Sequence, residues 1–262
     1  MKKKVLLCLF LLFVLLTNMV GCSRDSGGAL LDDPDFFSPD TESTDSKHEL
    51  PAGASLSVHF LDVGQADAAL VLCDGEAMLI DGGNTADSQF LYSYLDAQGI
   101  DHLDYVVCTH AHEDHVGGLA AALNACTADV IYAPVQSYES KAFDDFLKYA
   151  AAQDISVTVP EPGSQFDLGS AEVQILGPQK EYEEPNNTSL VLRVVFGETS
   201  FLFTGDAERE AEQDMIDAGV SLSSTVLKVG HHGRCLLYTS TQRERTVLKS
   251  IRGFSASRTK TT

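Results

Sequence analysis

The sequence predicts an α/β fold for residues 55–233. Short apolar segments bounded by turn-forming residues recur along this stretch, as is typical of buried strands. Longer segments with helical periodicity lie between them, so strands and helices alternate along most of the domain. A stretch of about 180 residues is also long enough to bury a core of its own.

The first part of the domain is expected to be rich in strands. The predicted strands are residues 56–63, 68–73 and 77–80 and a segment that ends at Cys108. Asp74-Gly75 has the composition of a hairpin turn between two of them. A helix at 86–98 is expected to end at Gly99, because glycine readily adopts the left-handed conformation that closes a helix.

Helices and strands alternate more regularly after the loop that follows Cys108. The predicted helices are residues 116–125, 138–153 and 207–218. The predicted strands are residues 129–132, 155–159, 171–176, 189–196, 200–204 and 225–229. This pattern indicates sheets covered by helices, but periodicity alone does not order the layers.

A histidine-rich loop follows Cys108 and contains His110, His112, Asp114 and His115. The carboxyl end of a strand is where α/β proteins place ligand sites. Imidazole nitrogen and carboxylate oxygen are ligands that zinc, manganese and iron accept. His110 and His112 are two residues apart, so both side chains point the same way from extended backbone. Asp114 and His115 follow where the chain turns, an arrangement that suits two metals better than one.

The order His110-x-His112-x-Asp114-His115 resembles the signature of the metallo-β-lactamase-fold hydrolases. Two later segments match as well, Thr204-Gly205-Asp206 and Gly230-His231-His232-Gly233. Residues 62–68 and 187–192 resemble the branch that includes the extracytoplasmic hydrolase domain of competence DNA-uptake proteins. The resemblance implies a four-layer αββα sandwich with two divalent metal ions, zinc or manganese, at the edge of its sheets.

The resemblance also implies roles for individual residues. The implied metal ligands are His110, His112, Asp114, His115, Asp206 and His232. Asp206 would bridge the two metals, although an Asp after a strand and a glycine can also cap the next helix. Asp114 would orient the nucleophile or carry its proton. We expect His232 to bind the second metal and His231 to protonate the leaving group, but the sequence does not settle which does which.

Three further residues are expected to support the ligands. Asp81 matches an Asp that usually holds a ligating histidine in the family. Asp62 would do similar work or cap a turn, and the same choice applies to Asp67. Asn187 lies where many relatives carry another histidine ligand. This difference favours the DNA-uptake branch and a weaker first metal, manganese rather than zinc, and it argues against a true β-lactamase.

The first 22 residues have the pattern of a lipoprotein signal peptide. Three lysines precede twelve apolar residues, too few to span a membrane. Met19-Val20-Gly21-Cys22 resembles a lipobox, with Cys22 as the lipidated residue; an ordinary secretory signal is the alternative. Residues 23–54 are acidic and poor in apolar side chains, which predicts a disordered linker. We expect an exported protein anchored to the outer face of the bacterial cytoplasmic membrane.

The charge of the domain limits its partners. Residues 54–233 contain 6 Lys and Arg against 29 Asp and Glu, a net charge of −23. Such a surface repels polyanions, which argues against strong general binding of DNA. Residues 234–262 carry 7 Lys and Arg against one Glu and match nothing expected there. They are either a basic tail for anionic surfaces or the product of a truncated or frameshifted coding end, which would leave the fold incomplete.

These observations favour an exported dinuclear hydrolase in which a metal-bridging hydroxide attacks a phosphodiester or phosphoester bond. Nucleic acid is among the substrates that the resemblance allows. One alternative is the same fold acting on a lactone, thioester or amide. Another is a non-catalytic surface binding protein. The sequence indicates no protein partner.

Overall fold

The computed structural model describes residues 50–231. The predicted signal peptide with Cys22, the linker up to residue 49, His232 and the basic tail lie outside the described residues. Among the helices of the described range, none combines the length and the apolar character that crossing a membrane requires.

The first sheet consists of five strands in the order β1-β2-β3-β4-β5. They are β1 (Leu56–Phe60), β2 (Ala69–Cys73), β3 (Glu76–Ile80), β4 (His102–Val107) and β5 (Thr127–Tyr132). β1, β2 and β3 pair antiparallel, and β4 and β5 continue the sheet in parallel. Asp74 and Gly75 both have positive φ, as the predicted hairpin turn requires.

The second sheet has the order β10-β9-β8-β7-β6 among the described residues. Its strands are β6 (Gln165–Leu168), β7 (Ala171–Gly177), β8 (Val191–Phe196), β9 (Thr199–Phe203) and β10 (Val226–Lys228). Neighbours pair antiparallel except for β10, which runs parallel to β9 over three residues.

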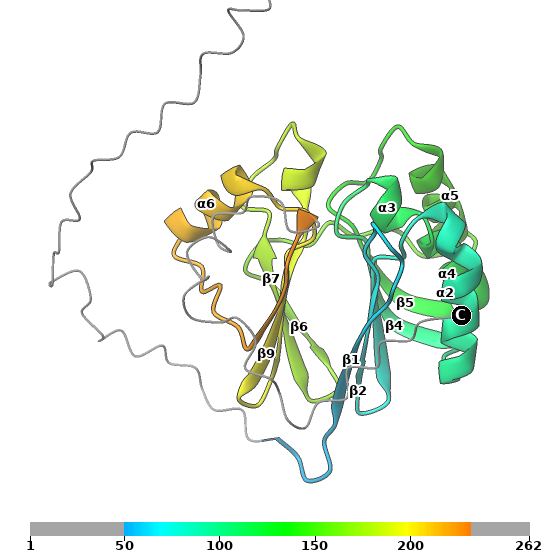
Figure 1. Ribbon diagram of the computed structural model, residues 1–262, viewed down its shortest axis with the longest axis horizontal. Helices are drawn as coiled ribbons and strands as arrows, with labels where there is room; N and C mark the ends of the chain where they lie inside the picture. Colours follow the sequence, from blue (N-terminus) through cyan, green and yellow to red (C-terminus); the bar gives the residue numbers. More distant parts are fainter. Residues whose placement is uncertain (1–49, 232–262) are drawn as a thin grey trace, which may run out of the picture. The chain divides into compact units, whose positions relative to one another are not determined.

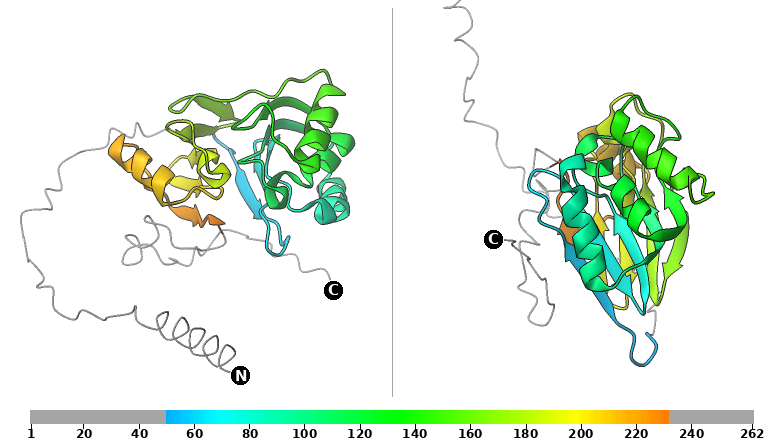
Figure 2. Two further views of the ribbon diagram at one scale, coloured as in Figure 1. Left: turned by 90° about the horizontal axis from the view of Figure 1, so that it is seen from above. Right: turned by 90° about the vertical axis from the view of Figure 1, so that its right-hand side faces the viewer.

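Helices cover the outer faces of the two sheets (Figures 1 and 2). The α-helices are α2 (Ser88–Gln98), α3 (Glu113–Val116), α4 (Leu119–Ala125), α5 (Lys141–Ala151) and α6 (Arg209–Asp217), and the short 3-10 turns are η1 (Thr85–Asp87) and η2 (Pro185–Thr188). In Figure 1, α2, α4 and α5 lie outside the first sheet, and α6 lies outside the second. The expected four-layer αββα sandwich is confirmed.

Strands buried on both faces explain why the apolar runs were recognisable. On β2, Leu70 packs towards the helices and Val71 packs towards the other sheet, and neither side chain is exposed. On β3, Leu79 packs towards the helices and Met78 packs towards the other sheet. Neighbouring residues of a strand point to opposite faces, so a strand that is covered on both faces can be apolar on both.

Two predicted elements were wrong in detail, and one strand was missed. Residues 155–159 form only an isolated bridge between Thr158 and Tyr132 instead of a strand. The strand β6 was missed, because two of its four residues are exposed and polar and its pattern is short. The helix expected at 116–125 begins only at Leu119, as α4, and the separate short helix α3 ends at Val116, before Gly117-Gly118. A Cβ on Gly118 would lie 2.1 Å from the carbonyl oxygen of Gly82, so only glycine allows this close approach.

Candidate metal centre

The histidine-rich loop begins where β4 ends, beside the end of β3. Asp81, the residue after β3, has a φ of 58° and turns its carboxylate towards the loop. The backbone N–H of Thr109 donates to Asp81 Oδ1 at 2.7 Å, and the Thr109 hydroxyl donates to Oδ2 at 2.7 Å. The first residue of the loop is therefore fixed to the neighbouring strand.

Buried imidazoles and a carboxylate meet at this edge of the sheets. Possible ligand atoms of His110, His115 and Asp206 all lie within 4.8 Å of one another, and all three residues are buried. His110 Nε2 lies 3.1 Å from His112 Nδ1, and His115 Nε2 lies 3.4 Å from Asp206 Oδ1. Four of the six predicted ligands are thus brought together. His232 lies outside the described residues.

Asp114 lies on α3 and is partly buried. Its carbonyl oxygen accepts a hydrogen bond from the backbone N–H of Asp67 at 3.1 Å. It does not belong to the group of described residues whose ligand atoms lie within 4.8 Å of one another. The structure therefore places Asp114 next to the cluster, and its assignment as a ligand and proton carrier remains a prediction.

Asp206 enters the cluster from the second sheet, three residues after β9. Its backbone N–H donates to Ser189 Oγ at 3.0 Å, which fixes the turn. Its Oδ1 accepts from the backbone N–H of His231 at 2.9 Å in addition to facing His115. Helix α6 begins after Glu208, with that residue at its N-cap, so Asp206 does not cap the helix.

His231 is held next to Asp206 but faces a carboxylate of its own. Its Nδ1 lies 3.1 Å from Glu208 Oε1, which also accepts from Asn186 Nδ2 at 3.0 Å. Asn187 accepts the backbone N–H of Glu208 at 3.0 Å through its side-chain oxygen. Asn187 therefore supports the segment that carries Asp206. Glu208 was not predicted from the sequence, because only the fold brings it to His231.

The predicted supporting residues differ in their surroundings. Asp81 Oδ2 lies 2.8 Å from His115 Nδ1, the contact expected of it. Asp62 is exposed in the loop after β1, and its supporting role stays a prediction. In the same loop, Asp67 turns inwards instead, and its Oδ2 lies 2.6 Å from Lys228 Nζ.

Burial and neighbouring charges set the protonation of the three clustered residues. Burial, followed by the nearby His115, lowers the pKa of His110 well below its usual value, so this imidazole is neutral and has a free lone pair at neutral pH. Burial raises the pKa of Asp206, but the hydrogen bond and charge of His115 outweigh it and hold this carboxyl ionised. Burial lowers the pKa of His115, but Asp81 and Asp206 outweigh it and raise the pKa to about 10.

The donor set fits divalent cations. The neutral imidazole of His110 and the ionised carboxylate of Asp206 are suitable ligands for zinc or manganese, and His115 becomes one when a cation displaces its proton. Asp81 faces His115 Nδ1, so a proton there leaves Nε2 directed towards Asp206. Outer contacts of this kind fix the tautomer and orientation of a metal-binding histidine.

Residues 61–249 match the family described as the Metallo-beta-lactamase superfamily. The chain belongs to this superfamily. The match extends past residue 233, the predicted end of the domain.

Competence proteins are among the superfamily members that the chain resembles. ComE operon protein 3 of Bacillus subtilis is 28% identical over 195 residues, which are 67% of this chain and 25% of that protein. Competence protein ComA of Neisseria gonorrhoeae is 29% identical over 175 residues, 66% of this chain and 23% of that protein. The chain thus matches about a quarter of the length of these relatives. They confirm the branch that the sequence motifs predicted.

Among solved structures, the MIM-2 metallo-beta-lactamase is 18% identical, with a TM-score of 0.48. The similarity covers 69% of this chain and 74% of that one.

We predict that Asp81→Asn weakens metal binding about 10- to 100-fold. The amide keeps the size of the side chain but removes the charge that orients His115. Titration calorimetry with Zn²⁺ or Mn²⁺ on the full chain measures the effect. Asp96→Asn, which removes an exposed charge from α2 of the same acidic protein, is the matched control. Equal affinities in the two variants would contradict the role of Asp81.

We also predict that metal binding releases protons and strengthens as pH rises. His115 retains its proton up to about pH 10, so a cation that binds its Nε2 near neutral pH must displace that proton. Titration in two buffers of different protonation enthalpy should give different apparent binding enthalpies. Identical enthalpies, or an affinity that falls between about pH 6 and about pH 9, would contradict this prediction.

Proposed function

We propose that this chain is an exported, lipid-anchored dinuclear metallohydrolase that cleaves phosphoester bonds, with phosphodiesters and nucleic acid among its candidate substrates. The observation that carries the proposal is the buried group of His110, His115 and Asp206 with His112 beside it. Bound zinc or manganese would supply an activated water and would stabilise the charge that develops on the substrate oxygen.

The side chains around the cluster have distinct proposed tasks. His110, His112, His115, His232 and Asp206 would hold the cations. Asp114 would orient the attacking water and accept its proton. Glu208 contacts Nδ1 of His231, which would keep a proton there and leave Nε2 to face the leaving group.

The acidic composition limits how a phosphoester would be held. With 6 Lys and Arg in residues 54–233, the domain offers few cations to follow a phosphate backbone. The metals would therefore supply most of the attraction for the substrate. This favours recognition of one phosphate group over a long electrostatic track along a nucleic acid.

We predict metal-dependent hydrolysis of bis(p-nitrophenyl) phosphate by the full chain and a kcat at least about 100-fold lower in Asp114→Asn. The substitution removes a proton acceptor at nearly constant volume. Asp96→Asn, at an exposed position of α2, is the control and should retain activity. Phosphodiester, single-stranded DNA and lactone substrates are compared in parallel.

The outcomes of this comparison separate the candidate functions. If only the lactone is cleaved, the proposed phosphoester substrate is wrong and the alternative substrate class takes its place. Bound metal without hydrolysis of any substrate would favour a binding protein. Full activity in Asp114→Asn would remove the proposed role of that carboxylate.

Export and anchoring are tested separately at Cys22. A diacylglyceryl group on this thiol would hold the domain at the membrane surface. Radiolabelled palmitate should enter the wild-type chain and fail to enter Cys22→Ser. Equal labelling of both, or no labelling of the wild type, would contradict the lipid anchor.

A further inference from the structure

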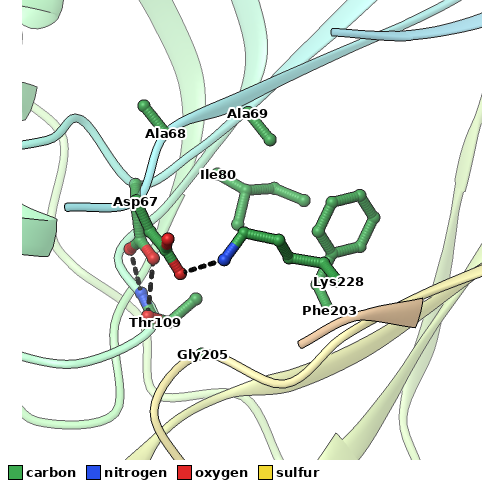
Figure 3. A pocket seen from close by; sticks show the side chains of 9 residues that line it. Asp67, Ala68, Ala69, Ile80, Thr109, Phe203, Gly205 and Lys228 are labelled. Carbon is green, nitrogen blue, oxygen red and sulfur yellow. Dashed lines mark hydrogen bonds and ion pairs between the residues drawn. The ribbon is translucent and has the colours of Figure 1, made fainter. Parts of the chain in front are cut away.

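An ion pair joins the two halves of the domain beside the metal centre (Figure 3). Lys228, the last residue of β10, places its Nζ 2.6 Å from Asp67 Oδ2. Their side chains are 27% and 11% exposed. Both residues line a pocket together with Asp81, Thr109 and Gly205, each of which touches or adjoins a member of the cluster.

The backbone of Asp67 is tied to the histidine-rich loop. Its N–H donates to the carbonyl oxygen of Asp114 at 3.1 Å. Its carbonyl oxygen accepts the N–H of Gly83, two residues after Asp81, at 2.8 Å. Asp67 is thus fixed to the histidine-rich loop and to the segment that contains Asp81. Its side chain contacts Lys228, which belongs to the second sheet.

Lys228, at the other end of the ion pair, directly precedes the segment that contains His231. β10 is only three residues long and pairs with β9 alone among the described strands. Three residues after Lys228, the N–H of His231 donates to Asp206. A Cβ on Gly230 would lie 2.2 Å from the carbonyl oxygen of Gly205, so the segment passes very close to the Asp206 turn. A small shift of β10 would therefore move this segment relative to the cluster.

A mostly buried ion pair is a poor source of stability, because desolvation offsets most of its attraction. Fixing one arrangement among several is a better-supported use of such a pair. Here the pair connects residues 161 positions apart, at the junction where both halves of the domain supply groups to one site.

We propose that the Asp67–Lys228 ion pair is a positioning contact that sets the Val229–His231 segment against the cluster and thereby strengthens the binding of the second cation. This inference rests on the proposed two-metal site. It assigns a role to Asp67, which lies in the motif of residues 62–68.

Electrostatics alone predicts the opposite effect of removing Lys228. A positive charge beside a cation site repels the cation, so Lys228→Met should tighten metal binding if charge is all that matters. If Lys228 positions β10, the same substitution should weaken one of the two binding events, as lost outer contacts typically do. The sign of the change distinguishes the two explanations.

The experiment is a calorimetric titration of the full chain with Zn²⁺ and with Mn²⁺. We expect Lys228→Met to weaken one binding event about tenfold or more and to leave the other unchanged. Lys180→Met is the matched control, because Lys180 forms an exposed ion pair with Asp214. This control removes the same charge and should not weaken binding. Lys228→Arg keeps a cation facing Asp67 and should recover part of the affinity.

Asp67→Asn/Lys228→Met covers the case in which an unpaired carboxylate unfolds the single variant. This double variant restores charge balance without restoring the contact, so positioning predicts weak binding of the second cation in a chain with wild-type circular dichroism. Wild-type or tighter binding in Lys228→Met, or in the double variant, would overturn the proposal while leaving the proposed function intact. A wild-type chain that binds neither metal would overturn both.

Discussion

The carboxylate of Asp81 is the contact on which the candidate metal centre depends. It accepts two hydrogen bonds from Thr109 and faces Nδ1 of His115, while its own N–H donates to Val107 at 2.8 Å. The side chain of this buried residue therefore fixes the start of the histidine-rich loop and its last histidine, and its backbone N–H fixes the end of β4. The buried charge is tolerated because hydrogen bonds and an imidazole surround it.

The strands of the fold were predictable where burial gives them a run of apolar residues. β2 and β3 are apolar on both faces because they lie inside the sandwich, so their segments were found with small errors at the ends. β6 was not found, because a short strand with exposed polar residues lacks that signal. The break between α3 and α4 depends on the approach of Gly118 to Gly82, which are distant in sequence.

The candidate site was predictable where its residues are close in sequence or lie in motifs. His110, His112 and His115 belong to one loop, and Asp206 follows a strand and a glycine turn. Glu208 and Lys228 were not predictable in the same way, because their importance comes from contacts with His231 and Asp67 that only tertiary packing creates. For the same reason, the sequence did not show that Asp67 turns inwards and Asp62 outwards.

The division of the site between the two sheets has a consequence for how the protein matures. His110 and His115 are synthesised well before Asp206, and contacts of such long range form late in folding. A complete cation site would therefore exist only after the second sheet has docked onto the first. Because a cation would bind the docked form in preference to the separated halves, metal supply would control how long this acidic domain stays open to proteases after synthesis.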